Sequence, residues 1–203
     1  MNFKLILAFL LTAIIAAPFA HSAERIKVGS RGKTVPLNEI TTLTSQEGES
    51  DRDFIVRTGT WLRNFTVSGG YEGCSNICRA PDGRLGVILA TNNSHFACSL
   101  TSRCPAGFSL TGDSIHSHPA SYADIKFNEA DIAYMSDVAP SRRVLMNQSM
   151  RVDSRRFSDP DIQSGPGYLV TDTNILYQKG PRTTVVFAEL PPLDPDVIPS
   201  DDQ

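Results

Sequence analysis

Residues 114–119 are Ser-Ile-His-Ser-His-Pro, and residues 128–131 are Asn-Glu-Ala-Asp. Side chains two positions apart on a β-strand point to the same face, so the imidazoles of His116 and His118 can converge on one metal ion. Asp131, at the start of a following helix, would supply a third ligand. Three nitrogen or oxygen ligands that leave a fourth position to water are typical of a catalytic zinc site. The two segments therefore predict a strand, a loop and a helix that together carry a zinc site.

The same residues also have a purely structural interpretation. His-x-His pairs occur by chance on many strands, and Asn128 with Asp131 is typical of a helix start, with an N-cap residue and an acid in the first turn. Asp124, in the loop after the histidines, competes with Asp131 for the role of third ligand. This short pattern alone leaves these alternatives open.

A longer, ordered pattern favours the metal site. Residues 116–119 followed by Asn128-x-x-Asp131 resemble the His-x-His-Pro…Ser-x-x-Asp signature of the JAMM (MPN-type) metalloproteases, and Glu72, in Tyr-Glu-Gly, resembles that family's earlier glutamate. The likeness is greatest to bacterial JAMM-like domains found at the ends of Rhs-type toxins and as free-standing proteins. It covers roughly residues 50–190. Asn128 stands where the family has serine, and the stretch between the second histidine and this position is longer than in eukaryotic members.

The resemblance implies a fold and a mechanism. The implied fold is α/β, a mixed β-sheet flanked by helices in a JAMM/MPN-like, cytidine-deaminase-like sandwich. Zn²⁺ would be held by His116, His118 and Asp131, with Glu72 as general base and Asn128 stabilising the oxyanion. The implied reaction is hydrolysis of a peptide or isopeptide amide. Ser117 would point to the opposite face of the strand and support the ligands or the packing.

Other classes of function remain open. The chain is alternatively an inactive JAMM-like binding module, or a domain associated with a toxin or effector system and its partner. The expected partner is a peptide or protein substrate. Nucleic acid is not expected, because the net charge is −3 and no basic stripe with interleaved aromatic residues occurs. The sequence also has no glycine-rich phosphate loop and no Gly-x-Ser-x-Gly elbow.

Residues 1–23 are expected to be a signal peptide. Lys4 precedes an apolar run from Leu5 to Ala17 that is too short to span a bilayer, and small residues permit cleavage after Ser22 or Ala23. An uncleaved anchor is the alternative. Cleavage would leave a periplasmic or secreted protein without a membrane span.

Export determines how the cysteines are interpreted. An even number of cysteines in an oxidising compartment favours two disulfides over a zinc–thiolate cluster, and it leaves all three pairings open. The candidates are Cys74, Cys78, Cys98 and Cys104.

The remaining sequence predicts one domain at residues 50–190, between an N-terminal arm at 24–49 and a Pro/Asp-rich tail at 191–203. Ser50 caps a helix with apolar residues at helical spacing, and residues 74–79 and 86–89 form a hairpin. A helix runs from Asn128 to about Val138. His95 is expected to be solvated, and residues 140–164 to form a solvated segment or, alternatively, a substrate-binding flap. The final strands are expected at 168–171, 175–177 and 184–189.

Overall fold

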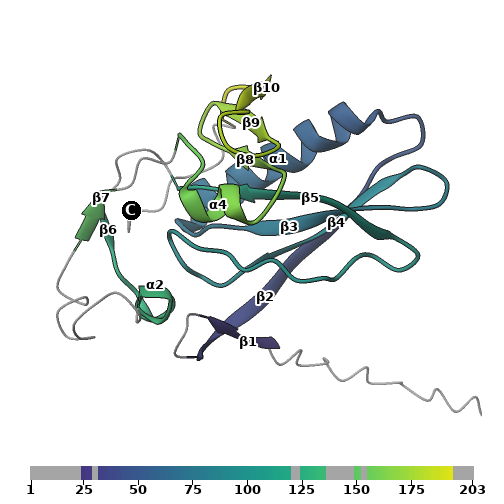
Figure 1. Cartoon of the computed structure of the whole chain (residues 1–203). Helices are drawn as coiled ribbons and strands as arrows, with labels where there is room; N and C mark the ends of the chain where they lie inside the picture. The colour runs from purple at the N-terminus through teal and green to yellow at the C-terminus, as the bar shows by residue number, and fades with distance from the viewer. Residues whose placement is uncertain (1–23, 29–31, 120–123, 136–148, 152–154, 194–203) are drawn as a thin grey trace, which may run out of the picture.

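The structure is a computed structural model that describes residues 24–28, 32–119, 124–135, 149–151 and 155–193 (Figure 1). These residues form a mixed α/β structure around an open eight-stranded sheet with the order β1-β2-β4-β3-β5-β8-β9-β10. The strands are β1 (Glu24–Val28), β2 (Lys33–Thr44), β3 (Cys74–Arg79), β4 (Leu85–Thr91), β5 (Ser109–Ser117), β8 (Gly167–Val170), β9 (Asn174–Gln178) and β10 (Val185–Glu189). The helices are α1 (Asp51–Gly69), α2 (Glu129–Met135) and α4 (Asp159–Gln163), and β6 (Asp124–Lys126) pairs with β7 (Ser149–Arg151) in a separate small sheet.

One parallel pairing determines how the sheet is connected. Strands β5 and β8 run parallel, with Ser114 beside Gly167 and Ser117 beside Val170, whereas the other neighbours in the large sheet are antiparallel. Parallel neighbours require a crossover connection, which here contains α2 and α4. The expected α/β class with a mixed sheet and few helices is therefore confirmed.

Helix α1 packs on the sheet and encloses the main core. Its N-cap is Ser50, whose side chain accepts a hydrogen bond from the backbone N–H of Asp53, as the sequence predicts. Phe54, Ile55 and Leu62 are buried against residues of β3, β4 and β5. Burial of each such side chain stabilises the fold by roughly 1.5–3 kcal/mol. The predicted helix and the predicted hairpin of β3 and β4 are both confirmed.

The predicted N-terminal arm belongs to the sheet. β1 and β2 form an antiparallel hairpin, and β2 pairs with β4 from Asn38 to Thr44. Val28 of β1 and Val35 of β2 pack with Ala130 of α2 in a second small core. The first part of residues 24–49 thus extends the sheet instead of preceding the domain. The expected signal peptide lies outside the described residues, as does the expected tail beyond residue 193.

Two disulfides join β3 to the long loop that follows β4. They link Cys74 to Cys98 and Cys78 to Cys104. Both predicted disulfides are therefore present, and they fit an oxidising environment. Among the described residues, no helix combines the length and the apolar character needed to cross a membrane.

Candidate metal centre

The end of β5 directs alternate side chains to opposite faces of the sheet. Ile115 and Ser117 are fully buried toward α1, where the Ser117 hydroxyl lies 2.5 Å from the hydroxyl of Thr66. His116 and His118 share the other face, and their ring centroids are 5.0 Å apart. The prediction that the two imidazoles converge, and that Ser117 has a packing role, is confirmed.

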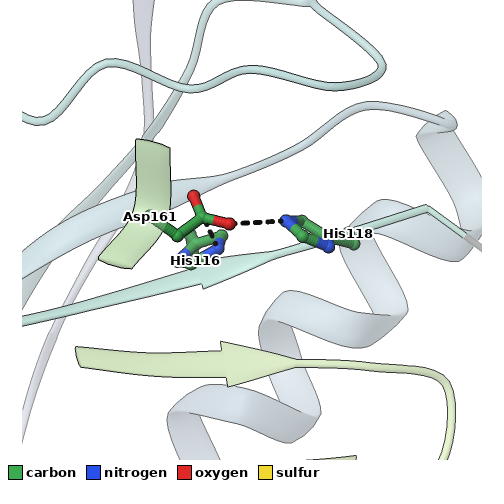
Figure 2. Close-up of side chains that lie close together, drawn as sticks. All are labelled: His116, His118 and Asp161. Atoms are coloured by element: carbon green, nitrogen blue, oxygen red, sulfur yellow. Dashed lines mark ion pairs between the residues drawn. The ribbon is translucent and has the colours of Figure 1, made fainter. Parts of the chain in front are cut away.

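Asp161, in α4, completes a three-residue cluster with the histidines. Figure 2 shows its carboxylate between the two imidazoles. Nε2 of His116 lies 3.4 Å from Oδ1 of Asp161, and Nε2 of His118 lies 3.6 Å from Oδ2. Ligand atoms at zinc-bonding distance from one tetrahedral ion lie roughly 3.3–3.5 Å from each other. The three side chains can therefore hold a metal ion.

One nitrogen that faces the cluster lacks a hydrogen bond. Nε2 of His116 is buried and contacts the Asp161 carboxylate at 3.4 Å without forming a hydrogen bond of normal geometry. Buried polar atoms are rarely left in this state, because an unmade hydrogen bond costs about 1–3 kcal/mol. Burial raises the pKa of the Asp161 carboxyl, but the contacts with His116 and His118 outweigh burial and hold that pKa below its usual value. Asp161 is thus kept as a carboxylate, the form that binds metals.

Glu72 lies beside this cluster, immediately before β3, where the sequence places it. Its side chain is buried, and its Oε1 is 3.6 Å from Nε2 of His118. Its backbone N–H donates to the carbonyl of Ser94, and its own carbonyl accepts from the hydroxyl of Thr91. Burial raises the pKa of Glu72 to about 8, against the opposing effect of His118. Without a bound cation Glu72 is therefore mainly protonated at neutral pH, and a cation held beside it would favour the ionised form that accepts a proton.

Asp131, expected as the third ligand, is not part of the cluster. It is fully buried and accepts hydrogen bonds from the Ser94 hydroxyl at 2.7 Å and from the His95 backbone N–H at 2.8 Å. The His95 ring contributes a third contact, with Nδ1 at 2.7 Å. These three contacts join the Asp131 carboxylate to the loop that follows β4. The prediction that His95 is solvated is wrong, because His95 is buried against Asp131.

Asn128 has the structural role that its sequence context also allowed. Its side-chain oxygen accepts from the backbone N–H of Asp131, and its backbone N–H donates to the Asp131 carboxylate. Its amide nitrogen donates to the carbonyl of Asn93. Asn128 and Asp131 together cap α2 and fasten it to the neighbouring loop. Asp124 begins β6, but its side chain lies outside the described residues.

The segment from Phe157 to Asp161 brings residues to the centre that the sequence patterns did not predict. Ser158 and Asp161 form a capping box at the start of α4, with the Ser158 hydroxyl 2.7 Å from Oδ2 of Asp161. Phe157 packs its ring edge-on against His116. The segment lies within residues 140–164, which were expected to form a solvated segment or, alternatively, a substrate-binding flap. The available signal was a second motif, Ser158-x-x-Asp161, of the same form as Asn128-x-x-Asp131.

Comparison of the chain with protein-family models, curated proteins and solved structures gives no match. The chemistry of the site is therefore argued from its geometry.

Proposed function

We propose that this chain is an exported zinc-dependent hydrolase that cleaves a peptide or isopeptide amide bond. The proposal depends mainly on one observation, the placement of Asp161 at 3.4 Å from His116 and 3.6 Å from His118. Two imidazoles and a carboxylate suit zinc better than magnesium or calcium, which prefer oxygen ligands. Two disulfides support the exported location.

Each site residue has a distinct role in this proposal. His116, His118 and Asp161 would hold the ion, which when bound would polarise the substrate carbonyl and lower the pKa of water toward about 7. Glu72 would accept the proton of the attacking water and deliver it to the leaving amine. Burial strengthens its hold on a proton, which suits the delivery step, and the nearby cation would favour the carboxylate needed for the first step. A buried carboxylate beside the ligand cluster thus supports hydrolysis over metal storage.

Ser158 supports the likeness to the JAMM signature. Residues 158–161 provide Ser-x-x-Asp with the serine itself, so the substitution at Asn128 no longer counts against the likeness. The stretch between Pro119 and Ser158 is much longer than the family pattern and contains β6, α2 and β7. The Ser158 hydroxyl lines the same pocket as Glu72 and His116. Its proton is donated to Oδ2 of Asp161, so Ser158 would hold that carboxylate in position for the ion.

A chelator-controlled peptide screen tests this function. Zinc-loaded protein with both disulfides formed is incubated with a peptide library before and after zinc removal. The proposal expects cleavage that disappears with the chelator, returns with added zinc and is lost in Glu72→Gln. A protein that binds zinc stoichiometrically but cleaves no peptide or isopeptide would instead be a binding module.

A further inference from the structure

A pocket of about 590 Å³ adjoins the candidate metal centre. Glu72, His116 and Asp161 line part of it. The loop after β4 contributes Phe96, Ala97 and Leu100 to the lining, and α4 contributes Pro160. A volume of this size accommodates a substrate side chain together with its backbone. The pocket therefore has a reactive part and an apolar part.

The loop that forms the apolar part is fixed before any ligand binds. Cys98 is bonded to Cys74 of β3, and both cysteines line the pocket. The backbone N–H of Ser99 donates to the side-chain oxygen of Asn92 at 2.7 Å. The hydroxyl of Tyr134, in α2, lies 2.7 Å from the Ser99 hydroxyl and donates to the same Asn92 oxygen. Because this loop is already held in place, it loses little conformational entropy when a ligand binds.

The charges of the pocket restrict what it can bind. Among its described lining residues, the acidic side chains are Glu72 and Asp161, and both belong to the candidate centre. No lysine or arginine in this lining offers a partner to an acidic group. An acidic side chain would therefore lose its hydration without gaining an ion pair. The lining contributed by Phe96, Leu100 and Pro160 instead favours an apolar side chain.

We propose that this pocket selects substrates with an apolar residue, of leucine or phenylalanine size, next to the scissile amide. Phe96 and Leu100 determine the specificity by contacting that side chain. The inference rests on the proposed function, because it assigns a substrate class to the same centre. It goes further by naming residues that bind neither the metal nor the reacting amide.

Hydroxamate binding, measured by calorimetry on zinc-loaded protein, tests the pocket separately from catalysis. Acetohydroxamate has no side chain and reports on the centre alone. N-acetyl-leucine hydroxamate and N-acetyl-aspartate hydroxamate add an apolar and an acidic side chain. The variant is Leu100→Asp, and the matched control is Leu110→Asp, which changes a leucine that is 50% exposed and does not line this pocket.

The leucine compound is expected to bind the unmodified protein and Leu110→Asp at least about tenfold more tightly than the other two compounds, as apolar contacts in a pocket typically allow. Leu100→Asp should lose this advantage while binding acetohydroxamate normally. Equal binding of the leucine and aspartate compounds, or an advantage that survives Leu100→Asp, would overturn the inference. Failure of acetohydroxamate to bind any of the zinc-loaded proteins would overturn the proposed function instead.

Discussion

Nε2 of His116 lies 3.4 Å from Oδ1 of Asp161, although β6, α2 and β7 separate the two residues along the chain. Their proximity follows from the parallel pairing of β5 with β8. The register places Ser114 beside Gly167 and His116 beside Leu169. α4 ends shortly before β8 begins, so this pairing brings α4 to the part of β5 that carries the histidines (Figure 1).

Gly167→Ala is therefore expected to disturb the candidate metal centre, although Gly167 is not one of its residues. A Cβ at residue 167 would lie 2.5 Å from the hydroxyl oxygen and 3.0 Å from the carbonyl oxygen of Ser114, so the hydroxyl would have to rotate and the contact between β8 and β5 would become too tight. We expect a loss of about 1–3 kcal/mol in the free energy of unfolding and weaker zinc binding. Urea denaturation and zinc titration measure the two effects. Gly69→Ala is the control, because its Cβ would make only an ordinary contact at 3.8 Å.

Removal of Asp131 is expected to destabilise the protein. Asp131→Ala leaves the Ser94 hydroxyl, the His95 ring and two backbone N–H groups without their buried acceptor. Loss of one partner from such a buried group costs about 3–5 kcal/mol. Asp161 is partly exposed, so Asp161→Ala should lower the free energy of unfolding of the metal-free protein by less than Asp131→Ala does. Urea unfolding of the two metal-free variants makes the comparison, and equal losses would contradict these assignments.

Glu72→Gln is expected to separate proton transfer from metal binding. The amide keeps the shape of the side chain but cannot accept a proton, so turnover should fall by about a hundredfold or more. Zinc affinity should remain close to that of the unmodified protein, because Glu72 lies outside the ligand cluster. Single-turnover kinetics and zinc titration provide the two measurements. Loss of zinc from this variant would make Glu72 a ligand.

The two disulfides are expected to differ in their effect on the pocket. Replacement of either cysteine pair by alanine should lower the free energy of unfolding by about 2–5 kcal/mol. The Cys74–Cys98 bond lines the pocket, whereas Cys78 and Cys104 do not. Only the loss of the first bond should weaken binding of N-acetyl-leucine hydroxamate, measured by calorimetry at a temperature where both variants are folded. If loss of either disulfide weakened hydroxamate binding equally, the Cys74–Cys98 bond would have no special role in the pocket.

Local patterns predicted α1, the β3–β4 hairpin and the shared face of His116 and His118, because each depends on residues close together in the sequence. Asp161, the third member of the cluster, was missed for the opposite reason. Asn128-x-x-Asp131 and Ser158-x-x-Asp161 both form capping boxes, so the local pattern does not distinguish them. Only the pairing of β5 with β8 brings the second of them to the histidines. The contact of Asp131 with His95 is likewise non-local.

For residues 24–49 the sequence predicts a strand or an ordered arm followed by a loop, and it does not show that β2 joins the sheet, because many residues of β2 are polar. Thr41 is only partly buried, and Glu39 and Thr42 are exposed. Buried residues alternate only at its start, at Val35 and Leu37. Its pairing with β4 therefore depends on backbone hydrogen bonds to a distant strand, which composition does not reveal.

Zinc content of three matched proteins distinguishes Asp161 from Asp131 as the carboxylate that binds the metal with the two histidines. The unmodified protein, Asp161→Asn and Asp131→Asn are depleted with a chelator, reconstituted with zinc, freed of excess metal and examined by elemental analysis. The account predicts close to one zinc per chain in the unmodified protein and in folded Asp131→Asn, and little zinc in Asp161→Asn. Loss of zinc from Asp131→Asn with retention in Asp161→Asn, or no zinc in the unmodified protein, would contradict it.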